Sequence, residues 1–165
     1  MKIQVGGLSE GLHSFRFEAR AADLRLGESF PGVVTIDVQV EKTGHQLALN
    51  GTVKTVGAFE CDRCVARFTR PLVGRYRMHY LQDGTDAKGL DPSEVQAIPA
   101  GQSIIDIRDD VRQTVLLSVP LKVLCREDCK GLCPKCGGNL NERQCNCRDT
   151  AVDSRWDKLR SLPRN

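Results

Sequence analysis

Eight cysteines are the residues of this 165-residue chain whose type and spacing point most directly to chemistry. Six of them lie between Cys125 and Cys147 with the spacing C-x3-C-x3-C-x2-C-x8-C-x-C, and a C-x2-C pair lies upstream at Cys61 and Cys64. Thiols at this density are either disulfide halves or metal ligands. The N-terminal residues contain no apolar core of signal-peptide length, so we expect a cytoplasmic protein with reduced thiols. The cysteines are therefore interpreted as zinc ligands.

Tetrahedral zinc takes four ligands, so eight cysteines predict two Zn²⁺ ions per chain. The preferred partition is a long-range site and a local site, made respectively of Cys61, Cys64, Cys125, Cys129 and of Cys133, Cys136, Cys145, Cys147. A second partition joins Cys125 and Cys129 to Cys133 and Cys136, and leaves the upstream pair with the last two cysteines. In a third interpretation, Cys61 and Cys64 are only small buried hydrophobic residues.

The sequence Cys133-Pro134-Lys135-Cys136-Gly137 has the features of a metal-binding knuckle. Pro134 fixes the turn, and Gly137 permits the positive φ that must follow it. The same motif superficially resembles that of a thiol–disulfide oxidoreductase. There the second cysteine lies in a long helix, whereas two successive glycines here would break one.

Five arginines lie in the segment 63–77, which contains no acidic residue and overlaps the first cysteine pair. They are Arg63, Arg67, Arg70, Arg75 and Arg77. Arginines can neutralise phosphates, and Phe68 and Tyr76 could stack on unpaired RNA bases. The competing interpretation is a solvated strand face with core aromatic residues, because Arg75 and Arg77 lie on the opposite strand face from Tyr76.

Net charge gives no argument for a nucleic-acid partner. The formal charge is +3 at pH 7, and binding all eight thiolates to two Zn²⁺ ions would lower it to −1. The distribution is uneven, since residues 1–121 hold 14 basic and 15 acidic residues and residues 122–165 hold 10 and 6. The basic excess therefore lies at the cysteine-rich end of the chain.

The elements that must position these residues are mostly strands. Apolar and polar residues alternate over 13–20, 34–41, 46–54 and 72–81, which predicts an antiparallel meander of about five strands with Cys61 to Cys64 at a turn. Residues 82–92 are acidic and glycine-rich without an apolar period, and they predict a mobile loop that extends through residue 103.

Helices are expected only after this loop. Ile107, Val111 and Val115 share one helix face, Asp106 can cap the helix, and Pro120 would stop it. A second short helix is expected at 153–162. The predicted fold class is therefore α+β, with a β-rich main domain at 1–121, including the mobile loop at 82–103. A zinc-ribbon-like module with a C-terminal helix follows at 122–165.

An enzyme is disfavoured because the sequence contains no Walker-type loop, nucleophile elbow or zinc-protease motif. All-cysteine zinc sites are closed, whereas catalytic zinc keeps an open position. No stretch approaches the ~18 apolar residues that span a membrane. We expect a non-catalytic protein with neither a small-molecule substrate nor a membrane partner. The alternative is a zinc–thiolate redox switch or a thiol–disulfide protein.

The sequence around the cysteines resembles the YceD-type large ribosomal RNA subunit accumulation family of bacteria and plastids. The resemblance is carried by residues 117–137 and 139–141, the last cysteine pair, and the turn Glu60-Cys61-Asp62-Arg63-Cys64, which matches the family's C-x-R-C signature. The tail at 153–162 is similar too, although Ser154 stands where the family usually has Pro.

The resemblance extends over about residues 60–162, and the first 59 residues match only in strand pattern. It implies a ribosome biogenesis factor that supports large-subunit (23S) rRNA accumulation. The implied partners are this rRNA or a pre-ribosomal particle, with ribosomal proteins as further partners. The resemblance implies no catalytic residues.

Overall fold

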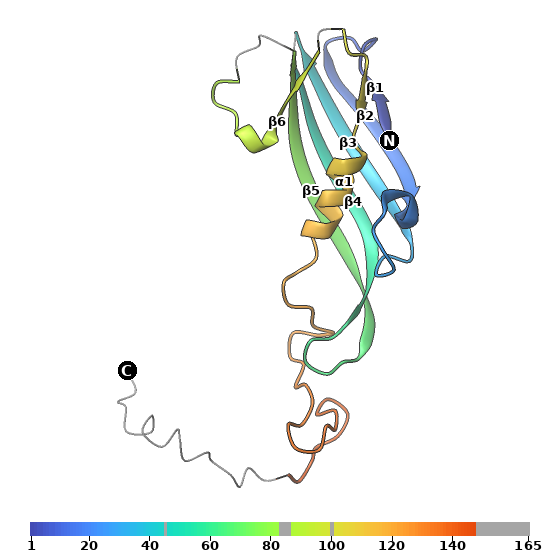
Figure 1. Cartoon of the computed structure of the whole chain (residues 1–165), viewed down its shortest axis with the longest axis vertical. Coiled ribbons are helices and arrows are strands. Elements are labelled where there is room, and N and C mark those ends of the chain that lie inside the picture. The colour runs from blue at the N-terminus through green and yellow to red at the C-terminus, as the bar shows by residue number, and fades with distance from the viewer. Residues whose placement is uncertain (45, 83–86, 100, 148–165) are drawn as a thin grey trace, which may run out of the picture.

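The structure is a computed structural model that describes residues 1–44, 46–82, 87–99 and 101–147. Its strands are β1 (Lys2–Gln4), β2 (Gly11–Arg20), β3 (Val33–Thr43), β4 (Gln46–Glu60), β5 (Arg67–Gln82), β6 (Val95–Ile98) and β7 (Ile104–Asp106). Its helices are the 3-10 turns η1 (Ala21–Leu24) and η2 (Pro92–Glu94) and the α-helix α1 (Arg108–Leu117). The described chain is thus mostly β-sheet with one α-helix, as the sequence predicts (Figure 1).

Strands β2 to β5 form the predicted antiparallel meander, in which each strand pairs with the next. Along β3 the apolar side chains of Val34, Ile36, Val38 and Val40 are at most 1% exposed, and polar residues alternate with them. This alternation follows from the pleat, which points successive side chains to opposite faces. The turn between the long strands β4 and β5 carries the first cysteine pair, so its predicted position is confirmed.

The sequence did not predict the three shortest strands. β6 lies inside the segment 82–103 for which a loop was predicted, and it pairs with β5 in parallel from His79↔Val95 to Gln82↔Ile98. β1 and β7 pair with each other in a separate two-stranded sheet. Runs of three or four residues are too short for a periodic signal, and it is their pairing with distant strands that makes them regular.

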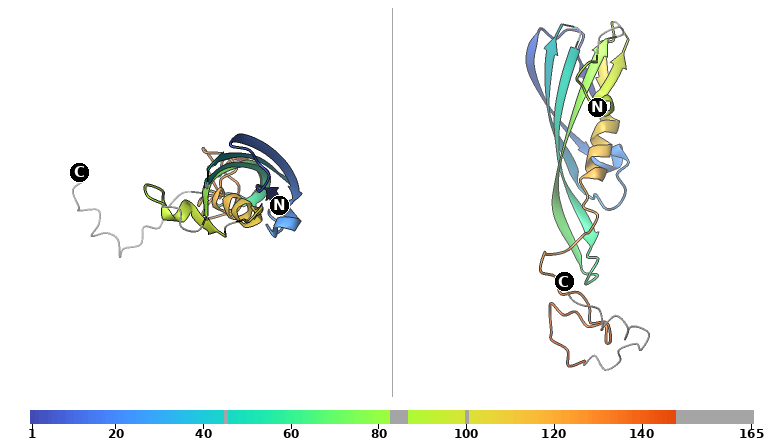
Figure 2. Two further views of the ribbon diagram at one scale, coloured as in Figure 1. Left: turned by 90° about the horizontal axis from the view of Figure 1, so that it is seen from above. Right: turned by 90° about the vertical axis from the view of Figure 1, so that its left-hand side faces the viewer.

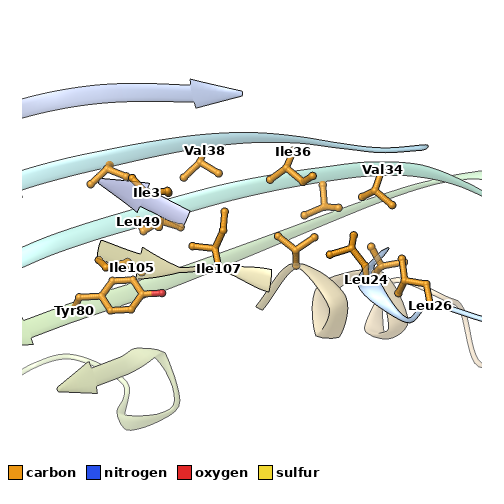
Figure 3. Packing of buried hydrophobic residues seen from close by; sticks show 14 of the residues in the cluster. Ile3, Leu24, Leu26, Val34, Ile36, Val38, Leu49, Tyr80, Ile105 and Ile107 are labelled. Carbon is orange, nitrogen blue, oxygen red and sulfur yellow. The ribbon is translucent and has the colours of Figure 1, made fainter. Parts of the chain in front are cut away.

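Helix α1 lies inside the curve of the sheet, as the left view of Figure 2 shows. The predicted apolar face is confirmed, since Ile107, Val111 and Val115 are at most 1% exposed and join the core with sheet residues such as Leu49 (Figure 3). The predicted cap is wrong by one residue: Ile107 is the N-cap. The Oδ1 atom of Asp106 accepts a hydrogen bond from the backbone N–H of Arg108 at 3.1 Å, which still satisfies a free donor of the first turn.

One polar pair is held between the helix and the sheet. The hydroxyl of Tyr80, on β5, donates a hydrogen bond to Asp110 Oδ2 of α1 at 3.2 Å. Burial raises the pKa of both groups, and the negative charge of Asp110 raises that of Tyr80 further. The hydrogen bond therefore lets a fully buried aromatic side chain keep a polar partner.

The helix predicted at 153–162 lies outside the described residues. Within the part of the chain that the structure describes, no helix is both long and apolar enough to cross a membrane. The boundary at residues 121 and 122 between a main domain and a cysteine-rich module stays a prediction.

Gly74 of β5 allows the close approach of α1, because it has no side chain where Thr114 packs. A Cβ atom at this position would lie 2.5 Å from Thr114 Cγ2 and 3.0 Å from the Thr114 carbonyl oxygen. Gly74→Ala should therefore lower the free energy of unfolding by about 1–3 kcal/mol, measured by urea denaturation. Gly32→Ala is the matched control, because nothing lies within 4 Å of its added Cβ. Equal stability of the two variants would contradict close packing at Gly74.

Candidate metal centres

The first centre joins two distant parts of the chain. Cys61 and Cys64 lie in the turn between β4 and β5, Cys125 and Cys129 lie after α1, and all four sulfurs lie within 4.8 Å of one another. Cys61 Sγ lies 3.8 Å from Cys129 Sγ, and Cys64 Sγ lies 3.6 Å from Cys125 Sγ. Bonded sulfurs would be about 2.05 Å apart. Four sulfurs at about 2.3 Å from a tetrahedral metal lie about 3.8 Å from one another, so these cysteines fit a metal centre.

Backbone N–H groups favour the thiolate form of Cys61. Burial by itself would raise the pKa of this thiol, but the N–H groups of Cys125, Arg63 and Cys64 hydrogen-bond its sulfur and lower the pKa to about 6. The turn that aims two of these groups is tight: the N–H of Val65 donates to the Cys61 carbonyl, and Val65 has a φ of 59°. A thiolate is the form of cysteine that binds metal, so the turn prepares a ligand.

The two residues between the first cysteines hold the second pair in place. Asp62 and Val123 exchange hydrogen bonds, from Asp62 N–H to the Val123 carbonyl at 2.9 Å and from Val123 N–H to Asp62 Oδ2 at 2.6 Å. The Nη1 group of Arg63 donates to the Cys129 carbonyl at 2.7 Å. The segment after α1 is therefore docked on the β4–β5 turn by hydrogen bonds as well as by the gathered sulfurs.

The second centre is local. Cys133, Cys136, Cys145 and Cys147 have all four sulfurs within 4.8 Å of one another. The N–H of Gly137 donates to the Cys133 carbonyl at 2.9 Å, and Gly137 has a φ of 68°, so the predicted knuckle conformation is present. The N–H groups of Cys136 and Lys135 lower the pKa of Cys133 to about 6. The structure thus gathers the eight sulfurs in the preferred partition and not in the second one.

Asn141 is a residue of these centres that the cysteine spacing does not reveal. It lies in the loop between Cys136 and Cys145, yet its Nδ2 group donates a hydrogen bond to Cys129 Sγ of the first centre at 3.3 Å. Burial raises the pKa of Cys129, but the Asn141 amide and the Gly131 N–H outweigh it and lower the pKa. The family resemblance over residues 139–141 draws attention to Asn141, but only the folded chain shows which sulfur its amide hydrogen-bonds.

The five arginines of the segment 63–77 do not form one surface. Arg63 is committed to the first centre through its hydrogen bond to Cys129. The other four are exposed, but Arg70 points to the opposite strand face from Arg67, Arg75 and Arg77. Their role in binding RNA stays a prediction.

The aromatic residues of the same segment, Phe68 and Tyr76, are half-buried and pack against the protein core. A Cβ on Gly51 would lie 2.0 Å from the Tyr76 ring, so this ring lies directly over the glycine of the neighbouring strand. The Tyr76 hydroxyl is buried, has no hydrogen-bond partner among the described residues, and has its pKa raised by burial. Phe68 packs on Phe59, with ring centroids 6.4 Å apart, and against the first centre. The core interpretation therefore holds for Tyr76, which is not placed to stack on a base.

Comparison with known protein families identifies the lineage of this chain. The family model described as "Large ribosomal RNA subunit accumulation protein YceD" matches residues 49–163, which include all eight cysteines and α1. The chain belongs to the YceD family. The description of this family names large-subunit rRNA accumulation.

Similar curated proteins come from plants and bacteria. "Large ribosomal RNA subunit accumulation protein YCED homolog 1, chloroplastic" of Zea mays is 29% identical over 169 residues, covering 81% of this chain and 58% of its own. Its Arabidopsis thaliana namesake is 25% identical over 154 residues, covering 78% and 48%. An uncharacterized Mycobacterium tuberculosis protein is 29% identical over 132 residues, covering 77% and 60%.

The chain therefore spans about half to three-fifths of the length of these YceD relatives. No solved structure matches it significantly.

The different reach of the two centres predicts different effects of single ligand variants. Cys61→Ser should increase hydrogen exchange in the β4–β5 turn and around Cys125, because it opens the centre that docks these segments on each other. Cys133→Ser should increase exchange mainly within residues 132–147. Hydrogen exchange measured on peptides of both variants separates the two patterns. If Cys61→Ser leaves the segment around Cys125 as protected as in the wild type, the long-range centre is wrong.

Proposed function

We propose that this protein is a non-catalytic ribosome biogenesis factor that supports large-subunit rRNA accumulation by binding rRNA or a pre-ribosomal particle. The observation that carries the proposal is the YceD family match over residues 49–163, since the family description names large-subunit rRNA accumulation. The relatives from Zea mays and Arabidopsis thaliana carry the same description. Ribosomal proteins as further partners and a cytoplasmic location are part of this proposal.

Each four-cysteine centre is proposed to hold one Zn²⁺ ion, bound by the thiolates of Cys61, Cys64, Cys125, Cys129 and of Cys133, Cys136, Cys145, Cys147. A zinc ion with four thiolates has no open coordination position, so it supplies structural linkage and no Lewis-acid site for a substrate. Metal binding can contribute on the order of 10 kcal/mol to the folding of such a segment. Residues 122–147 need this source of stability, because in the described chain they contain no helix or strand beyond one isolated bridge, Leu132↔Asn139.

The proposed RNA-contacting surface is the β4–β5 part of the outer sheet face, with the basic cysteine-rich end. Arg75 and Arg77 are exposed there, and their cross-strand neighbours are the uncharged Thr52 and Asn50. Neither arginine forms an ion pair within the described residues. Arg77 donates one side-chain hydrogen bond, from Nε to Asn50 Oδ1.

The β2–β3 part of the same face is different, because its arginines are compensated. Arg16 is paired with Asp37 at 3.6 Å, and Arg20, at the end of β2, is paired with Asp23 at 3.0 Å. Arg75 and Arg77 of β5 thus differ from these arginines in having no acidic partner among the described residues, and they could neutralise a phosphate backbone.

A second candidate function is a zinc–thiolate redox switch. It is favoured by one observation, the exposure of Cys136 and Cys147 in the second centre. Exposed thiolates react with peroxides, and oxidation to a disulfide would release the metal. The buried first centre would then act as the structural centre, with only the second one responding to oxidant.

Zinc content gives the first test. Protein purified without chelator should contain two zinc ions per chain, because eight sulfurs form two four-sulfur groups. Elemental analysis against protein concentration gives the ratio. A ratio near one would retain a single centre, and metal-free protein with four disulfides would contradict both centres and the proposed structural role.

The RNA-binding proposal is tested by charge removal on β5. Arg75→Ala combined with Arg77→Ala should weaken binding to large-subunit rRNA and reduce the slope of log affinity against log salt by about 1.5, if both touch phosphate. Arg16→Ala combined with Arg20→Ala is the matched control, since it removes the same charge from ion-paired positions. Equal losses in the two double variants would assign the effect to net charge rather than to this surface.

A cellular measurement tests the function itself. Cells that lack the protein should contain less large-subunit than small-subunit rRNA. A normal ratio, together with zinc release at physiological peroxide concentrations, would favour the redox switch.

A further inference from the structure

Asn141 physically connects the two four-cysteine centres. Its position in the chain lies between Cys136 and Cys145, so it belongs to the loop that the second centre closes. Its side chain, however, donates to Cys129 Sγ, which belongs to the first centre. We propose that Asn141 is a positioning residue that couples the centres, so that metal in the second raises the metal affinity of the first. This inference rests on the proposed metal-binding role of both cysteine groups.

The orientation of the Asn141 amide is fixed by its surroundings. Its Oδ1 atom accepts hydrogen bonds from the backbone N–H of Lys130 and from Arg126 Nη2, both at 2.8 Å. A rotated amide would set its NH₂ group against these two donors and its carbonyl oxygen against the sulfur. The amide therefore has one favourable orientation, in which Nδ2 faces Cys129.

The loop that carries Asn141 is also fixed against the first centre. The N–H of Leu140 donates to the Gly131 carbonyl at 2.9 Å, and Asn139 Oδ1 accepts from both the backbone and the side chain of Asn141. Leu132 N–H in turn donates to the carbonyl of Arg63, in the turn of the first centre, at 3.1 Å.

A close approach at Gly131 brings these segments together. Gly131 has a φ of 77°, and a Cβ there would lie only 3.1 Å from the Arg63 carbonyl oxygen. The path from the second loop to the first turn is thus continuous and short, since only three residues separate Cys129 from Cys133.

The coupling follows from the conformational entropy of this loop. When Cys136 and Cys145 do not share a metal, residues 137–144 are held only by their hydrogen bonds, and presenting Asn141 to Cys129 must overcome the entropy of ordering the loop. Metal in the second centre closes the loop beforehand. The hydrogen bond to the metal-bound thiolate then strengthens the first centre, as outer-shell partners commonly do. By thermodynamic reciprocity, metal in the first centre must raise the metal affinity of the second by the same factor.

The experiment is a cycle of four full-length proteins: wild type, Asn141→Ala, Cys145→Ser with Cys147→Ser, and the triple variant. Affinity of the first centre for Zn²⁺ is measured by competition with a chelator, and Co²⁺ reports occupancy through its thiolate charge-transfer absorption. Asn141→Ala should lower the Zn²⁺ affinity of the first centre about tenfold. Disabling the second centre should lower this affinity by a similar factor, and the triple variant should show no further loss of affinity.

Two additional variants keep the result interpretable. Asn146→Ala is the matched control, because Asn146 is exposed between Cys145 and Cys147 and makes no side-chain hydrogen bond within the described residues. It should leave the first centre unchanged. Asn141→Asp keeps the acceptor for Lys130 and Arg126 but replaces the donor with a negative charge, so it should weaken the first centre at least as much as alanine.

Three outcomes would overturn the coupling. These are an unchanged affinity in Asn141→Ala, an equal loss in Asn146→Ala, or a full tenfold effect of Asn141→Ala when the second centre is already disabled. In each of these cases the wild-type protein still binds metal at both centres, so the proposed structural role survives. If neither centre of the wild type binds metal, that role fails and the coupling fails with it.

Discussion

The meeting of four sulfurs from the β4–β5 turn and from the segment after α1 is the constraint on which the rest of this structure depends. Cys61 and Cys129 lie 68 positions apart in the sequence, yet their sulfurs lie 3.8 Å apart. This requires the sheet to end at the turn and the chain leaving α1 to run along the sheet to the same end, as Figure 1 shows. Loop closure over such a distance is entropically unfavourable, and a metal bound by all four thiolates would offset this cost.

The sheet has two different faces. Its inner face packs against α1, for example where Tyr80 of β5 and Val111 of α1 are buried, and its outer face leaves Arg75 and Arg77 in solvent. Because side chains alternate along β5, aromatic and basic residues that are neighbours in sequence cannot serve the same ligand. A ligand of the outer face would therefore meet arginines without the aromatic ring of Tyr76, which favours contact with phosphates over stacking on bases.

The cysteine-rich end has a different physical character from the sheet. In the described residues it contains an isolated bridge instead of regular ladders, and its backbone groups are satisfied by turns such as Gly137 N–H to the Cys133 carbonyl. Its order must come from its sulfurs and from side chains that reach between centres, of which Asn141 is the clearest case. Metal bound by these sulfurs, as proposed, would hold the described part of this end against the β4–β5 turn.

The sequence by itself determined the local features. Alternation predicted β2 to β5, the apolar spacing of Ile107, Val111 and Val115 predicted α1, and the Cys-x2-Cys spacing with Gly137 predicted the knuckle, because each of these signals lies within a few neighbouring residues. The spacing left two partitions of the cysteines open, and three short strands were missed. Only the tertiary structure decided these points, together with the burial of the Tyr76 hydroxyl and the contact of Asn141 with Cys129. Each of these features depends on contacts between segments that are distant in sequence, and local periodicity carries no information about such contacts.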